Sequence, residues 1–207
     1  MDASGSQSNQ VYPPPSSNNA VGSSNTKILI TYASVNGSTK EIATQIGSII
    51  SSKIQSPTTV SILPMDQVTE LPQYQFIIIG SAVHNFEWVS PAKSWLSSNH
   101  TILSAKRVWA FSVGTPFAVG KFAQRMMESE EEESKLEKAI TDEIGKVEDH
   151  VLFNGRFLKS HASTRFNVWW RVMGGKFGDF RDTEKIDSWA EEVGNKIIES
   201  LGELEMA

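Results

Sequence analysis

A run of hydroxyl and amide side chains in the first quarter of the sequence is suited to binding an anion. Ser34, Asn36, Ser38 and Thr39 can each donate a hydrogen bond to a phosphate oxygen, and Gly37 lets the backbone turn tightly among them. An ordinary turn that caps the following helix is the alternative, although a turn alone does not require all four donors. We interpret the run as a phosphate-binding loop.

The position of this run supports the interpretation, because a helix is expected directly after it. Ser38 and Glu41 fit the S-x-x-E capping box, and the positive end of that helix would point at the anion. The loop is neither G-x-x-x-x-G-K-[ST] nor G-x-G-x-x-G, which excludes the usual loops for nucleoside triphosphates and dinucleotides. No Lys or Arg lies between Thr31 and Thr39, so neutral donors must hold the charge.

The elements that position this loop alternate between two patterns. Short apolar runs rich in β-branched residues indicate buried strands, and apolar residues at helical spacing indicate helices between them. The sequence therefore predicts a doubly wound α/β fold with a five-stranded parallel sheet. The expected strands are Lys27–Tyr32, Thr58–Leu63, Gln75–Gly80, Arg107–Ser112 and His150–Phe157. Helices are expected from Ile42 to Lys53, around Ala92–Leu96, within Lys121–Asp149 and over Glu184–Leu201.

Composition limits the classes of function. The 207 residues are 39% hydrophobic, which suits one domain, and the absence of Cys excludes disulfides, thiolate nucleophiles and Cys-ligated metal centres. The net charge of −5 disfavours a nucleic-acid partner. No apolar run approaches the length of a transmembrane helix. No metal site is predicted, and redox chemistry requires a bound cofactor.

The first 26 residues differ in composition from the rest. They are dominated by Ser, Asn, Gln, Gly and Pro, which cannot build a core, and they lack the pattern of a signal peptide. We expect residues 1–26 to be a disordered extension of a cytoplasmic protein and residues 27–207 to form the domain.

Two segments carry a family resemblance. Tyr32–Thr39 resembles the phosphate loop of flavodoxins, and Tyr74–His84 with the residues up to Trp88 resembles the third strand and flavin loop of flavodoxin-domain oxidoreductases. The resemblance implies the strand order 2-1-3-4-5 and a non-covalently bound FMN. In that order the ligand binds where the strand order reverses, between the first and third strands.

The resemblance and the loop positions together imply a set of site residues. The cofactor-binding residues expected are Ser34, Val35, Asn36, Gly37, Ser38, Thr39, Ser81, Ala82, Val83, His84, Phe86, Trp88, Ser112, Val113, Gly114 and Thr115. Phe86 and Trp88 either stack on the flavin or pack in the core. His84 is a candidate proton donor or a plain loop residue, and Arg156 pairs either with an anionic substrate or with a carboxylate at its strand end.

Further segments resemble menaquinone-dependent protoporphyrinogen IX dehydrogenases. They are Phe153–Phe157, Gly174–Gly175 and Gly178–Asp182. This similarity implies an FMN-dependent oxidoreductase that passes electrons between an organic substrate and a quinone. Those dehydrogenases are basic, with a basic, aromatic flavin loop where this chain has His84, Asn85 and Phe86. Because the propionates of porphyrins favour a cationic approach, the acidity of this chain leaves the substrate open.

Two other functions remain as alternatives. One is a soluble electron carrier that serves redox proteins, and the other is a binding module that has lost flavin.

Two segments have interpretations of their own. The acidic run Glu130–Glu133 is read as a solvated helix face, with an acidic docking surface as the alternative. Arg165–Met173 combines aromatic residues with cations, which is typical of peripheral segments at a lipid surface, although a helix that packs its Trp face on the domain is the alternative.

Overall fold

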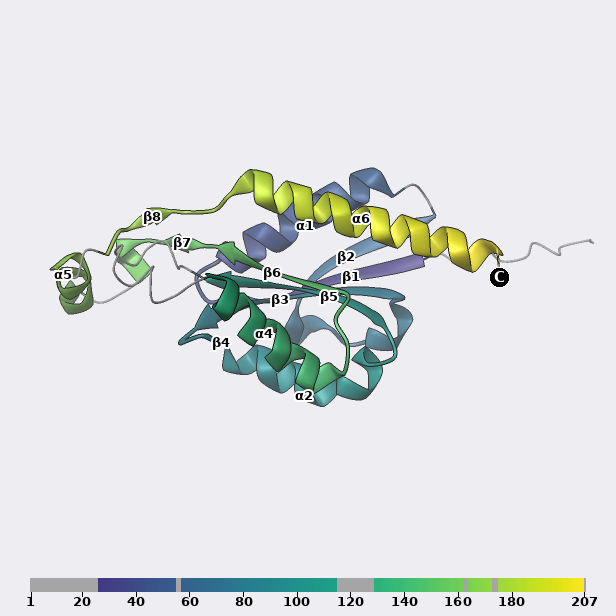
Figure 1. Cartoon of the computed structure of the whole chain (residues 1–207), viewed down its shortest axis with the longest axis horizontal. Helices are drawn as coiled ribbons and strands as arrows, with labels where there is room; N and C mark the ends of the chain where they lie inside the picture. The colour runs from purple at the N-terminus through teal and green to yellow at the C-terminus, as the bar shows by residue number, and fades with distance from the viewer. Residues whose placement is uncertain (1–25, 55–56, 115–128, 162–163, 173–174, 207) are drawn as a thin grey trace, which may run out of the picture.

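The computed structural model describes residues 26–54, 57–114, 129–161, 164–172 and 175–206, and its centre is a parallel sheet. The five parallel strands lie in the order β2-β1-β3-β5-β6, which confirms the predicted doubly wound topology (Figure 1). They are β1 (Thr26–Ala33), β2 (Thr58–Pro64), β3 (Phe76–His84), β5 (Arg107–Gly114) and β6 (Asp149–Asn154). Of the extension predicted for residues 1–26, only Thr26 lies within the described residues, as the first residue of β1.

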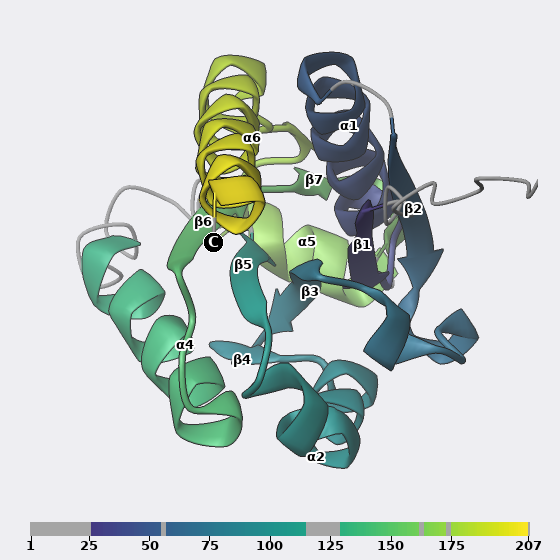
Figure 2. The same cartoon turned by 90° about the vertical axis from the view of Figure 1, so that its right-hand side faces the viewer.

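Two of the described helices cover each face of the sheet, as Figure 2 shows in a view along the strands. Helices α1 (Ser38–Lys53) and α6 (Thr183–Met206) lie on one face, and α2 (Ser90–Leu103) and α4 (Ser129–Ile144) lie on the other. Three short 3₁₀ helices, η1 (Met65–Gln67), η2 (Leu71–Gln73) and η4 (Lys159–His161), lie in connections. Among the helices described, none is long and apolar enough to cross a membrane.

The central strands are apolar on both faces, because helices cover both. Successive residues of β1 and β3 alternate between two cores: Ile28 and Ile78 pack under α1 and α6, whereas Leu29 and Ile77 pack under α2 and α4. Position 80 on β3 requires a glycine, since a Cβ there would lie 2.0 Å from the Phe111 ring on the neighbouring strand β5. The continuous Ile and Val runs of the sequence arise from this double coverage.

Two parts of the strand prediction were wrong. The fifth strand does not run to Phe157: β6 ends at Asn154, and β7 (Arg156–Phe157) pairs instead with β8 (Gly178–Asp179) in a separate antiparallel sheet. Helix α5 (Thr164–Val172) lies between β7 and β8 in the chain. An unpredicted strand, β4 (Glu87–Trp88), pairs antiparallel with the end of β3. Strands β4, β7 and β8 are each two residues long, which is too short to show a periodic pattern.

The acidic run is only partly a solvated face. Glu131 is exposed, but Glu132 is 6% exposed and its burial raises the pKa of its carboxyl group. Glu133 accepts a hydrogen bond at 2.7 Å from the backbone N–H of Leu152 on the edge strand β6. Helix α4 therefore uses one carboxylate to cover a sheet edge. Residues 121–128 of the predicted Lys121–Asp149 helix lie outside the described residues.

Candidate functional site

The loop between β1 and α1 is shaped by a glycine and a serine. Gly37 has φ +89°, in the left-handed region that favours glycine, and its N–H donates a hydrogen bond to Ser34 Oγ over 3.1 Å. Because the Ser34 oxygen is the acceptor, its O–H remains able to donate to another group. The loop folds back at Gly37, and α1 begins at Ser38.

The predicted capping box does not form. Gly37 is the N-cap of α1, Ser38 is already its first helical residue, and no side chain in the described part of the chain caps the helix. Ser38 Oγ instead accepts a hydrogen bond from the backbone N–H of Arg156 at 3.1 Å, and the Glu41 carboxylate binds arginines. Ser38 and Thr39 are both buried at the loop's base. The positive end of α1 therefore lies beside β7.

A cavity of about 130 Å³ lies at the carboxyl ends of β1, β3 and β5. It brings together three of the predicted loop segments and the start of β7, which supports the predicted location of the site at the reversal of the strand order. Its lining residues are Val35, Asn36, Ser38, Thr39, Ala82, Val83, His84, Val89, Val113, Gly114, Gly155, Arg156 and Phe157. We call it the loop cavity.

The rest of the hydroxyl loop faces a second hollow of about 470 Å³. Ser34 and Gly37 line it, together with Tyr32 and residues of η1. Val35 and Val89 line both hollows, so the two hollows adjoin each other. The predicted loop residues are thereby divided between two adjoining spaces.

An ion-pair network borders the loop cavity. Glu41 on the first turn of α1 pairs with Arg156 Nη2 at 2.8 Å and with Arg181 Nη1 at 2.5 Å. Arg181 also binds Asp179, and this hydrogen bond holds the pKa of the Asp179 carboxyl group below its usual value. The network ties the β7–β8 pair to α1. The structure thus shows Arg156 bound to a carboxylate, one of the two roles considered from the sequence.

Arg156 also has a group that the network does not satisfy. Its Nε is buried and has no hydrogen-bond partner among the described residues, although Arg156 lines the loop cavity with Ser38 and Thr39. A buried donor without an acceptor costs about 1 to 3 kcal/mol. An anionic oxygen in the cavity would remove that cost. The cavity therefore adds a cation to the neutral donors expected from the loop.

Close backbone packing at the ends of β5 and β6 forms one wall of the loop cavity. Gly155 N–H donates to the Gly114 carbonyl at 2.6 Å, and a Cβ at Gly155 would lie 3.0 Å from Val113 Cγ1. Ser81 is buried, does not line the cavity, and its Oγ donates to the Ala82 carbonyl at 2.9 Å. Thr115 lies outside the described residues. Gly155 also lines the loop cavity. It was not among the predicted cofactor-binding residues, because the sequence does not show that its backbone approaches β5 so closely.

His84 and Phe86 lie at a tight turn that joins β3 to β4. His84 lines the loop cavity and is exposed, and Asn85 and Phe86 follow it with φ of 53° and 63°. Two left-handed residues in succession are typical of a two-residue hairpin, where Asn-Gly is preferred and a bulky side chain is strained. Phe86 is 54% exposed. It lies outside the loop cavity.

Trp88 lies in the core rather than at the loop cavity, which corrects the prediction that it lines the cofactor site. The structure shows it 5% exposed, packed beneath α2 and α4, with its indole N–H donating to Ser112 Oγ at 2.7 Å. Ser112 is also fully buried and does not line the cavity. The packing alternative considered for Trp88 is the one observed.

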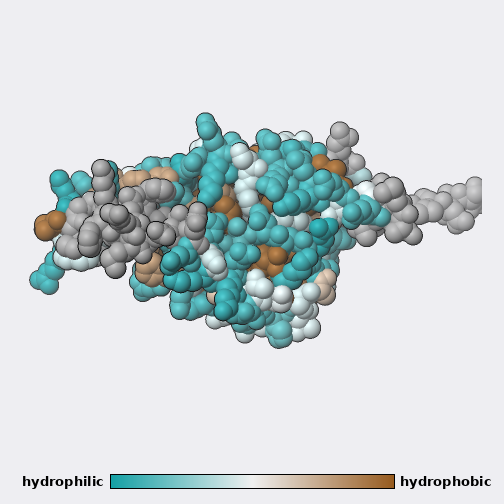
Figure 3. All heavy atoms as spheres, in the orientation of Figure 1, coloured by the Kyte–Doolittle hydropathy of each residue, from teal (hydrophilic) through white to brown (hydrophobic). Residues whose placement is uncertain are grey.

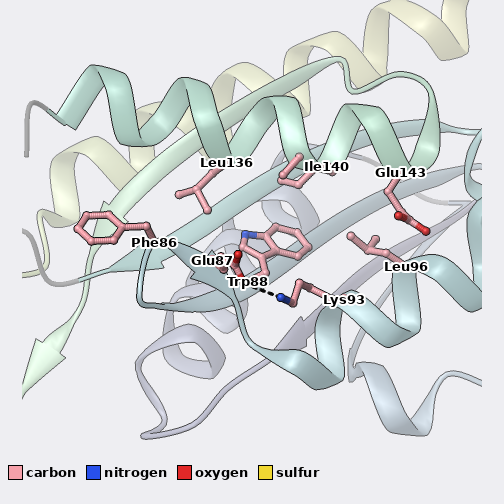
Figure 4. A pocket seen from close by; sticks show the side chains of 9 residues that line it. Phe86, Glu87, Trp88, Lys93, Leu96, Leu136, Ile140 and Glu143 are labelled. Atoms are coloured by element: carbon pink, nitrogen blue, oxygen red, sulfur yellow. Dashed lines mark hydrogen bonds and ion pairs between the residues drawn. The ribbon is translucent and has the colours of Figure 1, made fainter.

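Phe86 and Trp88 instead line a separate hollow of about 170 Å³ between α2 and α4 (Figure 4). The side chains of Leu136 and Ile140 on α4 point into this space, and the Lys93–Glu87 ion pair of 2.6 Å lies at its rim. None of the residues that line it lines the loop cavity.

His150 is a buried titratable residue that sequence reasoning missed. Its Nε2 lies 2.8 Å from Ser112 Oγ, and its Nδ1 has no partner among the residues described. Burial, with a smaller contribution from the nearby Lys185 charge, lowers the pKa of His150 to about 4. A polar residue within the apolar run His150–Phe153 was the only signal available from the sequence.

Comparison with known proteins places these features in a family context. The model of the flavodoxin domain family matches residues 29–170, which include all the residues that line the loop cavity. None of the curated proteins matches the sequence.

Several solved structures align with this chain at low sequence identity. The flavodiiron core of Flv1 from Synechocystis aligns with a TM-score of 0.51 and 15% identity, covering 88% of this chain and 37% of that one. Flavodoxin 2 from Bacillus cereus aligns with a TM-score of 0.49 and 23% identity, covering 82% and 99% of the two chains. A flavodoxin from the Archaea aligns with a TM-score of 0.48 and 18% identity, covering 83% and 98%. At this identity the Synechocystis structure shows a shared fold alone.

Proposed function

Because the chain belongs to the flavodoxin domain family, whose cofactor is FMN, we propose that it is an FMN-dependent oxidoreductase that passes electrons from an organic donor to a quinone. The observation that carries the cofactor part of this proposal is that Arg156 lines the loop cavity together with Ser38 and Thr39, and that its buried Nε has no hydrogen-bond partner among the described residues. An electron-transfer role follows from the family. The enzymatic role and the quinone are the further steps that we propose, together with a cytoplasmic location.

The residues of the site fit FMN. A phosphate dianion needs several donors. The loop supplies hydroxyls, the amide of Asn36 and the end of α1, and Arg156 on β7 adds a guanidinium N–H. Ala82, Val83 and Val113 give the same cavity an apolar wall against which a flat ring can lie. We assign the phosphate to the Ser34–Thr39 loop and the ring to the β3 and β5 ends.

Flavin chemistry fits the proposed reaction. FMN supplies a group that takes up two electrons and releases them one or two at a time. Two electrons and two protons leave the organic donor, and the quinone takes up two electrons and two protons to become a quinol. His84 is the exposed imidazole on the cavity wall, and it can hold or give a proton at this place.

Reoxidation by a quinone tests the enzymatic role. FMN-loaded protein is reduced without oxygen and mixed with menadione, and the flavin absorbance is followed. An enzyme gives a rate that saturates with menadione, and His84→Gln lowers the saturated rate about 100-fold if His84 transfers a proton. His100→Gln on α2 is the matched control and leaves the rate unchanged.

The same experiment identifies an electron carrier. A carrier gives a menadione rate that rises linearly and does not change with His84→Gln, while oxidised cytochrome c reoxidises it rapidly. The acidic body of the chain, with most of its carboxylates outside residues 156–181, is the feature that favours this second candidate. That result would overturn the enzymatic proposal and leave FMN binding intact.

Protoporphyrinogen IX is the donor that the sequence resemblance suggests. Its oxidation to the porphyrin releases six electrons and six protons, which three quinones can accept. The reaction is measured as porphyrin fluorescence that appears with menadione under anaerobic conditions. A donor with propionates requires cations at the site, and Arg156 and Arg181 are already paired with Glu41 and Asp179. No fluorescence above that of free FMN would restrict the proposal to other donors.

A further inference from the structure

The described residues between 156 and 181 (156–161, 164–172 and 175–181) project beyond the carboxyl ends of the sheet. They include β7, η4, α5 and β8, and Figure 1 shows α5 at the far end of the molecule from the C-terminus. We call residues 156–181 the β7–β8 segment. Its base contacts the candidate site, since Arg156 and Phe157 line the loop cavity.

The β7–β8 segment has a small aromatic core of its own. The Trp170 ring lies 5.4 Å from that of Phe157, and Phe157 stacks on Phe177 at 5.5 Å. Trp170 Nε1 donates to the Lys176 carbonyl, and a Cβ at Gly175 would lie 2.3 Å from the Trp170 ring. These contacts place α5 on β7, so one side of the helix faces inward.

The outer side of α5 exposes apolar residues. Val168 is 62% exposed, Trp169 54% and Val172 79%, and Arg165 precedes them at helical spacing. Figure 3 shows a hydrophobic tip at this end of the molecule, with hydrophilic groups beside it. The alternative of a helix that packs its Trp face on the domain therefore describes Trp170, which packs on Phe157, whereas Trp169 is 54% exposed.

The charge of the β7–β8 segment is opposite to that of the rest of the chain. It contains six of the 19 Lys and Arg residues and one of the 24 Asp and Glu residues. Its charge is thus +5, and that of the remaining sequence is −10, counting His as neutral. Lys159, Arg165, Arg171 and Lys176 are exposed and pair with no carboxylate among the described residues.

We propose that the β7–β8 segment binds an anionic lipid surface through the outer side of α5. A short helix with Trp and Val between arginines matches the headgroup region, where Trp rings lie at the interface and Arg side chains reach lipid phosphates. Its nine residues span about 13 Å, which is small for a protein interface that buries about 800 Å² on each partner. Lipid binding needs no such area, because each cation near an anionic surface adds attraction.

This contact has a consequence for the site. The lipid would lie on the same side of the molecule as the carboxyl ends of the strands, and the acidic body would face away from the negative surface. On the proposed function, a quinone dissolved in the bilayer then approaches the loop cavity directly. Lipid binding itself does not depend on FMN, so its test is separate from that of the oxidoreductase.

Vesicle sedimentation with the full chain tests the proposal. Vesicles of phosphatidylcholine with about one third phosphatidylglycerol are compared with pure phosphatidylcholine vesicles at 0.1 and 0.5 M NaCl. We expect binding to the anionic vesicles alone, and weaker binding at the higher salt concentration. Arg165→Gln with Arg171→Gln should weaken binding about 25-fold, because each charge contributes about fivefold. Lysines at both positions should retain binding.

A second double variant tests what the exposed apolar side chains of α5 contribute to lipid binding. Trp169→Ala with Val172→Ala should weaken binding at least tenfold, whereas Ile198→Ala on α6 and Lys135→Gln on α4 should have no effect, since they change an exposed apolar residue and a cation elsewhere. Equal thermal midpoints show that the variants are folded. A wild-type chain that stays in the supernatant with both vesicles, or a loss shared by the two controls, overturns the proposal. If the wild-type chain binds neither kind of vesicle, an acidic protein is the partner that this surface fits instead.

Discussion

The indole N–H of Trp88 donates a hydrogen bond to the hydroxyl of Ser112 over 2.7 Å, inside the core. The same hydroxyl lies 2.8 Å from Nε2 of His150, so one serine connects β4, β5 and β6. If its O–H donates to the imidazole, its oxygen still accepts the indole N–H. A buried series of hydrogen bonds of this kind stabilises the fold only while each side chain in it keeps its partner.

Removing the Ser112 hydroxyl should therefore destabilise the fold without altering the loop cavity. Ser112→Ala leaves the buried indole N–H and the imidazole without their shared partner, at an expected cost of about 1 to 3 kcal/mol in the free energy of unfolding. Urea denaturation followed by tryptophan fluorescence measures it. Ser98→Ala, on the exposed side of α2, is the control and should change stability by less than about 0.5 kcal/mol. If Ser112→Ala costs no more stability than Ser98→Ala, the hydrogen bonds that join Trp88, Ser112 and His150 do not stabilise the fold.

His150 should make stability fall between pH 6.5 and pH 4. The folded chain keeps its imidazole neutral because burial lowers its pKa from 6.5 to about 4, whereas the unfolded chain takes up a proton throughout this window. The unfolded state is thus favoured as pH falls, and the loss amounts to about 3 kcal/mol below pH 4. His150→Gln lacks the titration, so the stability difference between it and the wild type should shrink by that amount from pH 7 to pH 4. Parallel pH profiles would contradict the assignment.

The sheet and the phosphate loop could be predicted because their signals are local. Apolar runs such as Ile77–Ile79 indicate strands covered on both faces, and the hydroxyl-rich turn after the first strand is visible in eight residues. Trp88 could not be placed in this way. Its side chain is directed into the core by the pairing of His84 with Glu87, a two-residue strand pair that no periodicity predicts.

Long-range partners explain the other differences. Ser38 and Glu41 match a capping box over four residues, but Arg156, 118 positions after Ser38, takes up both side chains. A pattern of four neighbouring residues does not reveal that a residue so distant in the sequence binds the same two side chains. The expectation that neutral donors alone border the phosphate loop is incomplete for the same reason, since Arg156 reaches that cavity from β7.

Phe86 should be a strained residue whose replacement stabilises the protein. Its φ of 63° is costly for any residue with a Cβ, by about 1 kcal/mol or more, and its side chain is 54% exposed. Phe86→Gly is therefore expected to raise the free energy of unfolding by up to about 1 kcal/mol. If the ring also contacts flavin, FMN affinity falls about two- to tenfold, as for loss of one aromatic contact. Asn85→Gly is the matched control, because it relieves strain and keeps the ring. A destabilised Phe86→Gly variant would contradict the prediction.

The last prediction concerns how the FMN phosphate is held. Arg156→Gln removes the guanidinium whose Nε has no partner among the described residues, and it leaves Glu41 paired with Arg181. A hydrogen bond to an ionised group is worth about 1.5 to 3 kcal/mol, so FMN should bind about 10- to 150-fold more weakly, whereas riboflavin, which lacks the phosphate, should change little. Fluorescence titration with both ligands measures this.

Two further variants separate the phosphate site from the ion-pair network. Arg181→Gln breaks the same network through Glu41 but does not line the loop cavity, so its effect on FMN should be much smaller than that of Arg156→Gln. Ser34→Ala with Thr39→Ala should weaken FMN by several kcal/mol, about 1.5 to 3 for each hydroxyl that binds the phosphate, and should affect riboflavin much less. Ser34 Oγ also accepts the Gly37 N–H, so part of the loss reflects the loop itself and appears with both ligands. If FMN and riboflavin lose equal affinity in all three variants, the phosphate does not bind at this loop, and the hydroxyls serve only to shape the turn before α1.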